Sequence, residues 1–268
     1  MPSTWFLDTP PAGQLLDAGA VAHLLDAGSE QAPALNMLDF INHVVPVEYI
    51  SLVEYIDGVP SQVEGHAAGR RDNITAECFS LYKKRFRHAD DITRLAARMS
   101  AEALAQAPVT ALLYDAADIP DPAWRDQIFI GRHLTGRLSF LYSPVPRTIF
   151  AINLYRNRQN GKFEEADVAR LLGLAPLLKR AHRNALFAQL ASPDTPLRVA
   201  GIERTLQRTA PQLSAREREV CARIACGMGA DGIAAELGVA SSTVTTLRKR
   251  AYLKLSIHGR QQLLRFTH

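Results

Sequence analysis

The sequence predicts an α+β sandwich over residues 1–190, with helices flanking an antiparallel sheet, and an all-α domain over residues 212–268. Three observations support this prediction. Up to residue 190, runs rich in β-branched and aromatic residues alternate with amphipathic helical segments. Residues 191–211 begin with two prolines and a glycine, which indicates a linker with a short helix. Beyond it, glycines and capping residues separate segments that are all helical.

The strands of the first domain are predicted by their composition. The strongest pattern spans residues 47–67, where two β-rich runs flank Asp57-Gly58, a pair that suits the tight turn of a hairpin. Further strands are expected at residues 109–116, 136–144 and 147–157. This set of strands predicts one antiparallel sheet.

Helices are expected around these strands. The longest segment has acidic residues at its start and basic residues later, as the helix dipole favours. Part of its apolar stripe must cover the sheet, and any remainder would form the seam of a dimer. The expected helical segments are 15–28, 33–45, 75–87, 89–100, 122–131 and 164–190.

Composition and charge narrow the class of protein. Hydrophobic residues make up 47% of the 268 residues, and the three scattered cysteines form no disulfide pattern and fit a reducing cytoplasm. We find neither a signal peptide nor an apolar run long enough to cross a membrane. The net charge is +4, yet residues 212–268 alone carry +5. A small basic domain beside a near-neutral one indicates a nucleic-acid partner, with a basic membrane-surface helix as the alternative.

The C-terminal block contains four helical segments. Ser214 and Glu217 have the spacing of a capping box at the start of the first. A short second segment ends at Gly238, and a third of about four turns begins at Ser241. "SIHGRQQLLRF" forms the fourth. A short helix, a tight turn and a longer helix are what a helix-turn-helix requires.

The third segment, "SSTVTTLRKRAYLKL", has two distinct faces at helical periodicity. Four apolar residues form a stripe that we expect to be buried: Val244, Leu247, Ala251 and Leu255. Thr245, Thr246, Lys249 and Arg250 face the other way and suit base edges in a DNA major groove. Arg248 and Lys254 flank the stripe and could reach phosphates. The alternative is an ordinary amphipathic helix with a solvated basic face.

Residues 212–268 resemble the LuxR/FixJ-type helix-turn-helix of bacterial transcription regulators. The matching pieces are "LSAREREV", "IACG", "IAAELGV", "STV", "KRAYLKL" and Gly259-Arg260. The resemblance implies a four-helix domain that binds promoter DNA as a dimer on a two-fold-related site. Thr245, Thr246 and Lys249 would then face bases. The candidates for the DNA backbone are Ser241, Ser242, Thr243 and Arg260.

The block also departs from the family pattern. Ala240 stands where a serine is common, Thr245 where a lysine is usual, and Leu247 where a histidine is usual. Ala240 and Thr245 each remove a phosphate or base contact. Ser241 or Ser242 could still cap the third helix.

In this family, the domain that precedes the helix-turn-helix can be a phosphorylated receiver, an acyl-homoserine-lactone pocket or another ligand-binding domain. A phosphorylated receiver needs a parallel sheet with an acidic pair after its first strand, whereas Asp90-Asp91 follows a helical segment here. An acyl-homoserine-lactone pocket needs clustered Trp and Tyr with an Asp, and this chain has only Trp5 and Trp124. The order of elements is similar to the GAF- and PAS-like sensor domains of LuxR-type solo regulators. The similar pieces are "SLYKKRFRHADD", "NLYRN…GKFEEAD" and "LLGLAPLLKRA".

Several side chains in the first domain could surround a ligand cavity, although ordinary packing is the alternative for each: Tyr49, Ser51, Tyr55, His66, Cys78, Tyr82 and Trp124. No histidine spacing predicts a metal site, no cofactor is indicated, and no catalytic fingerprint is present. We therefore expect a cytoplasmic, dimeric, one-component bacterial transcription regulator rather than an enzyme, with RNA polymerase as a partner if it activates. Either a small molecule controls it through the first domain, or that domain serves only dimerisation or a protein partner.

Overall fold

The computed structural model describes residues 2–7, 16–25, 32–56, 58–93, 109–143, 148–191 and 195–267. The chain forms two compact units, Met1–Asn184 and Ala185–His268, whose boundary falls inside α7 (Glu165–Ala191). The first is α+β and the second all-α, which confirms the predicted fold class. The expected turn residue Asp57 and most of the segment expected at 89–100 lie outside the described residues.

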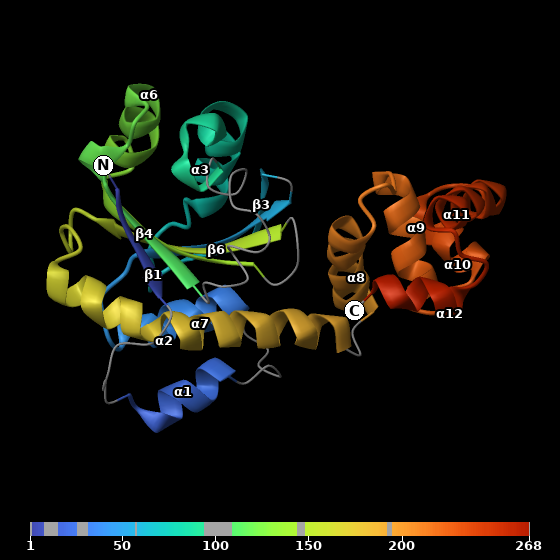
Figure 1. Ribbon diagram of the computed structural model, residues 1–268, viewed down its shortest axis with the longest axis horizontal. Helices are drawn as coiled ribbons and strands as arrows, with labels where there is room; N and C mark the ends of the chain where they lie inside the picture. The colour runs from blue at the N-terminus through green and yellow to red at the C-terminus, as the bar shows by residue number, and fades with distance from the viewer. Residues whose placement is uncertain are drawn as a thin grey trace. The chain divides into compact units, whose positions relative to one another are not determined.

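A six-stranded antiparallel sheet forms the centre of the first unit (Figure 1). Its spatial order is β1-β4-β5-β6-β2-β3. The strands are β1 (Ser3–Leu7), β2 (Tyr49–Ile56), β3 (Val59–Ala67), β4 (Val109–Asp115), β5 (Leu134–Tyr142) and β6 (Thr148–Asn157). The sequence predicts all of these except β1, an edge strand whose side chains are mostly exposed and so lack an alternating apolar pattern.

Helices cover both faces of this sheet. On one face lie α2 (Pro33–Asn42) and α7, while α3 (Thr75–Leu81) and α6 (Pro122–Trp124) lie on the other (Figure 1). α1 (Ala18–Leu25) packs on α2. The stripe of α7 is buried: Val168, Leu171, Leu172 and Leu178.

Two segments predicted as ordinary helices change their winding. α3 continues as a π-helix over Tyr82–Phe86 and then as a 3-10 turn over Arg87–Ala89. α6 likewise continues as a π-helix over Arg125–Ile130, and a 3-10 turn over Ala116–Asp118 precedes it. π-Helices are rare and concentrate at functional sites. Both lie on the same side of the sheet.

Beyond the end of α7, the described part of the second unit contains five α-helices. They are α8 (Thr195–Thr209), α9 (Ala215–Ala225), α10 (Ala230–Leu237), α11 (Ser241–Leu255) and α12 (Arg260–Leu263), the last followed by a 3-10 turn at Leu264–Phe266. The four helices after residue 212 are those that the sequence predicts. None of the described helices of the chain is long and apolar enough to cross a membrane.

α8 differs from the expected linker. We predict only a short helix within residues 191–211, yet α8 has 15 residues and its buried face packs in one core with α9. Pro196 lies in the first turn of α8, where no backbone N–H donor is needed, so it does not break the helix. Val199, Ile202 and Leu206 supply the buried apolar stripe.

Candidate functional site

The first candidate site is the outer face of α11. Val244, Ala251 and Leu255 are buried and Leu247 is half-buried, which confirms the predicted stripe. Val244 packs with Ile233 of α10. On the opposite side Thr246, Lys249 and Arg250 are exposed, and Thr245 is half-buried. The structure therefore gathers the four predicted base-facing residues on one face.

The turn between α10 and α11 sets the direction of α11. Gly238 ends α10 in the left-handed conformation, with φ of 65°, which residues with a Cβ rarely adopt. The N-cap of α11 is Ala240, and it makes no side-chain cap. The expected cap by Ser241 or Ser242 is thus wrong, because the hydroxyl of Ser241 lies 2.6 Å from Oδ1 of Asp231 on α10 and bonds to it instead.

The predicted backbone-contacting residues fall into two groups. Ser242, Thr243 and Arg248 are exposed around the start and edge of α11. Lys254 instead donates to Oε2 of Glu217 at 2.7 Å, and Arg260 donates to the carbonyl of Ala225 at 3.2 Å. The side chains of Lys254 and Arg260 therefore stabilise the domain by bonding to α9.

Glu217 is the centre of that internal bonding. It forms the predicted capping box with Ser214, at 2.7 Å and 3.3 Å for the two hydrogen bonds. Burial by itself would raise the pKa of Glu217, but the hydrogen bonds from Lys254 and Ser214 outweigh it and lower the pKa below 4.5. Glu217 is therefore a charged group that fixes α11 to α9.

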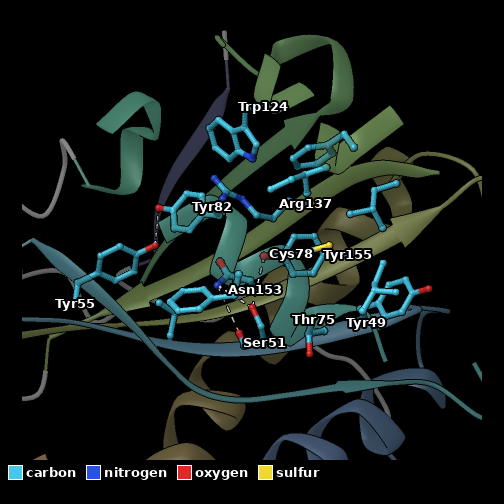
Figure 2. A pocket seen from close by; sticks show the side chains of 16 residues that line it. Tyr49, Ser51, Tyr55, Thr75, Cys78, Tyr82, Trp124, Arg137, Asn153 and Tyr155 are labelled. Atoms are coloured by element: carbon cyan, nitrogen blue, oxygen red, sulfur yellow. Dashed lines mark hydrogen bonds between the residues drawn. The ribbon is translucent and has the colours of Figure 1, made fainter. Parts of the chain in front are cut away.

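The second candidate site is a cavity in the first unit, between the sheet and the layer of α3 and α6 (Figure 2). Sheet register builds its floor. Tyr155 of β6 lies opposite Tyr49 on one side and Arg137 on the other, and Asn153 lies opposite Ser51. Side chains two residues apart on a strand share a face. These five side chains therefore meet on the inner face of the sheet.

A β-bulge extends this floor. The register of β5 against β6 shifts between Leu134 and Gly136, so Leu134 joins Arg137 in lining the cavity. The roof comes from the helices, with Cys78, Phe79 and Tyr82 on one side and Trp124 with Phe129 on the other. Both π-helices thus supply cavity walls. The cavity is partly open to solvent, and its free volume is about 50 Å³, or room for about three water molecules.

A buried polar network closes one side of the cavity. Arg137 donates from both terminal nitrogens to Asp90 at 2.9 Å, and Tyr82 donates to Asp90 at 2.9 Å. The hydroxyl of Tyr55 lies 3.3 Å from that of Tyr82. Burial raises the pKa of Tyr55 and of Tyr82 well above 10, so both phenols stay neutral.

Six of the seven residues predicted for a cavity line this one: Tyr49, Ser51, Tyr55, Cys78, Tyr82 and Trp124. His66 does not. It pairs with Ile50 in the register of β2 and β3, one residue out of phase with Tyr49 and Ser51, and so lies on the other face of the sheet. Its ring instead lies 2.9 Å from Oε1 of Glu64.

The polar residues contributed by β5 and β6 are not among those that the sequence predicts for a cavity. Asn153 and Tyr155 alternate along a predicted strand, and Arg137 is the charged residue within another, "GRLSFLY". Polar residues that alternate along a strand, and a charged residue within an apolar strand, both indicate polar side chains that face the interior of the domain. Their meeting with β2 depends on strand order, which the local sequence does not carry.

These features define a two-part molecule: a helix-turn-helix unit and an α+β unit with a cavity. Residues 211–267 match the family described as "Bacterial regulatory proteins, luxR family". The C-terminal domain is therefore a LuxR-family helix-turn-helix domain, as its motifs predict.

Curated relatives also match this chain over part of its length. It is 61% identical over 51 residues to a probable transcriptional regulatory protein NarL of Mycobacterium tuberculosis, which covers 19% of this chain and 24% of that protein. It is 32% identical over 105 residues to a putative HTH-type transcriptional regulator of Aeromonas salmonicida, which covers 36% of this chain and 54% of that one. The chain thus spans between a quarter and about half of the length of these relatives.

Among solved structures, the chain is similar to crystalline SdiA of Escherichia coli. The TM-score is 0.45 at 14% identity, over 93% of this chain and 95% of that one.

Proposed function

We propose that this chain is a bacterial one-component transcription regulator that binds double-stranded promoter DNA through α11. The observation that supports this most directly is the outer face of α11 in a LuxR-family domain, with Thr246, Lys249 and Arg250 exposed. Lysine and arginine donate to guanine acceptors in the major groove, and the threonine methyl suits thymine. Thr245 completes this face.

Phosphate contacts would position the helix. Ser242, Thr243 and Arg248 surround the base-facing residues and are exposed, so they can reach the sugar-phosphate backbone. Ser241, Lys254 and Arg260 are engaged within the domain, and we assign them a supporting role. The excess of positive charge in residues 212–268 favours association with DNA.

The remaining parts of the proposal concern assembly. A helix-turn-helix reads two half-sites as a dimer, and we expect a homodimer here, working in the cytoplasm. RNA polymerase is the expected partner if the regulator activates. We assign no catalytic activity, since the relatives of the C-terminal domain are transcription regulators.

The cavity is the proposed control site. A small molecule that binds one conformation of the first unit better than another shifts the population of the regulator and so its DNA binding. An aromatic-walled cavity with convergent polar groups is the form that such sites take. Its small free volume also suits the second candidate, a unit that serves dimerisation or a protein partner without a ligand.

A mobility-shift assay with a promoter fragment that the unmodified protein binds specifically tests the proposal that α11 binds DNA. We expect Lys249→Ala with Arg250→Ala to abolish specific binding while the far-UV circular dichroism spectrum stays unchanged. The matched control is Arg216→Ala with Arg265→Ala, which removes the same charge from exposed positions outside α11. Unchanged promoter binding by the first pair refutes the assignment of α11 to the groove.

A further inference from the structure

Arg137 is the lining residue that most strongly determines which ligands suit the cavity. This side chain is 4% exposed, and its guanidinium carbon lies 4.8 Å from the ring centre of Tyr114 and 5.5 Å from that of Trp124. Its two terminal nitrogens are both taken by Asp90. The charge of Arg137 is therefore already balanced within the protein.

Asp90 has no capacity left for a ligand. It is fully buried and accepts from Arg137 twice, from the hydroxyl of Tyr82 and from the backbone N–H of Ile92. An ionised carboxylate offers about four acceptor positions. A ligand that needs an acidic partner for its own N–H or ammonium group finds none at Asp90.

Nε of Arg137 is different. It is buried and has no hydrogen-bond partner among the described residues, although Arg137 lines the cavity. Leaving a buried donor unsatisfied costs free energy, so an acceptor placed there is favoured. The hydroxyl of Ser51 lies 3.4 Å from the amide nitrogen of Asn153 and 3.5 Å from the hydroxyl of Tyr155. Because these contacts are long, the amide of Asn153 and the hydroxyl of Tyr155 can each turn to donate a hydrogen bond to a ligand.

The rest of the lining is apolar and largely aromatic. Phe79, Tyr82, Trp124 and Phe129 form the roof, and successive rings touch edge-on or tilted, with centres between 5.6 Å and 6.1 Å apart. Such walls suit a flat apolar body. Burial raises the pKa of Cys78, and likewise that of Tyr155, so neither adds a negative charge.

We infer, on the basis of the proposed function, that the effector is an uncharged, flat, mainly apolar molecule with a strong hydrogen-bond acceptor, such as a carbonyl oxygen, which Nε–H of Arg137 donates to. An anion would meet no net positive charge, because Arg137 and Asp90 cancel. A cation would meet the charge of Arg137, and the lining holds no carboxylate to pair with it. A cavity of about 150 Å³ accepts a benzene ring. The present free volume of about 50 Å³ must therefore increase when such a molecule binds.

Four probes of nearly equal shape test this inference on the full chain: acetophenone, cumene, benzoate and 1-phenylethylamine. They differ in bearing a carbonyl, no polar group, an anion or a cation. Differential scanning calorimetry at equal probe concentrations ranks their affinities, because a ligand of the folded state raises Tm. We expect acetophenone to bind about tenfold more tightly than cumene, as one added hydrogen bond to a charged donor implies. The two ions should give no shift.

Two variants locate the preference. Arg137→Lys keeps a cation beside Asp90 but lacks the Nε donor, and it should reduce the advantage of acetophenone over cumene to less than about twofold. The matched control is Thr110→Val on β4, which removes a different buried polar atom, the Thr110 hydroxyl, that also lacks a partner among the described residues and lies away from the cavity lining. It should leave the ranking unchanged.

The outcomes separate this inference from the proposed function. Cumene binding as tightly as acetophenone, or benzoate binding more tightly, overturns the acceptor preference while leaving the cavity as the control site. No shift with any probe overturns the effector cavity itself, and the mobility-shift result on α11 is unaffected. If Arg137→Lys does not fold, the ranking of the four probes on the unmodified chain still decides.

Discussion

Lys254 on α11 places its ammonium nitrogen 2.7 Å from Oε2 of Glu217 on α9, and the Glu217 side chain is only 4% exposed. The residue that the sequence suggests for a DNA phosphate thus ties the proposed recognition helix to the first helix of its domain. Lys249, one turn and a residue earlier, is exposed on the outer face. Two lysines of one helix therefore have separable roles.

Replacing Lys254 should weaken folding more than DNA reading. Lys254→Ala leaves the buried carboxylate of Glu217 without its charged donor, and we expect the free energy of unfolding to fall by about 1–3 kcal/mol. Lys249→Ala, the matched control, should change stability by less than about 0.5 kcal/mol and abolish specific DNA binding. Urea unfolding and a mobility-shift assay measure the two effects. Equal stability of both variants contradicts this division of roles.

The same carboxylate makes stability depend on pH. Because the folded pKa of Glu217 lies below its ordinary value of 4.5, its contribution is present above pH 4.5 and is lost as the pH falls through the folded pKa. We expect the unfolding free energy to drop more steeply between about pH 5 and pH 3 in the unmodified chain than in Glu217→Gln. Identical pH profiles for the two proteins would falsify the linkage.

Two glycines of the helix-turn-helix should respond in opposite directions to alanine. Gly238 has φ of 65°, and a Cβ there meets nothing within 4 Å, so Gly238→Ala costs only backbone strain, about 1 kcal/mol. Gly232 lies inside α10, also in open space, so Gly232→Ala should stabilise by about 0.5–1 kcal/mol. Thermal unfolding of the two variants measures whether each substitution lowers or raises the stability. A loss of stability in both contradicts the helical assignment of Gly232.

The sequence predicts those features of the two sites that depend only on the spacing of residues within one strand or one helix. Tyr49, Ser51 and Tyr55 alternate along one strand, and Cys78 and Tyr82 are four apart on one helical segment, so each group shares a face from sequence spacing alone. The stripe of α11 follows in the same way. These residues were placed without knowledge of any contact.

Non-local contacts explain what was missed. Asn153 meets Ser51 across 102 residues because β6 and β2 are neighbours in the sheet. Arg137 of β5 meets Asp90, which follows the 3-10 turn after α3, across 47 residues. His66 was misplaced because its face depends on the register of β3, which shifts opposite Leu52 and Val53. The sequence predicts a phosphate contact for Lys254 and does not show that Glu217 lies beside it.

Cysteine reactivity reports on the cavity independently of any ligand preference. Burial raises the pKa of Cys78, which lines the cavity, and raises the pKa of Cys221, in the core of the second unit, to about 12. Thiolate is the reactive form, so at pH 8 both should react with iodoacetamide at less than about a tenth of their rates in the urea-unfolded chain. Mass spectrometry of digests measures each site. A ligand that enters the cavity should slow Cys78 further and leave Cys226, which is half-buried and outside the cavity lining, unchanged. Labelling of Cys78 in the folded chain at its unfolded rate contradicts its place in the cavity lining.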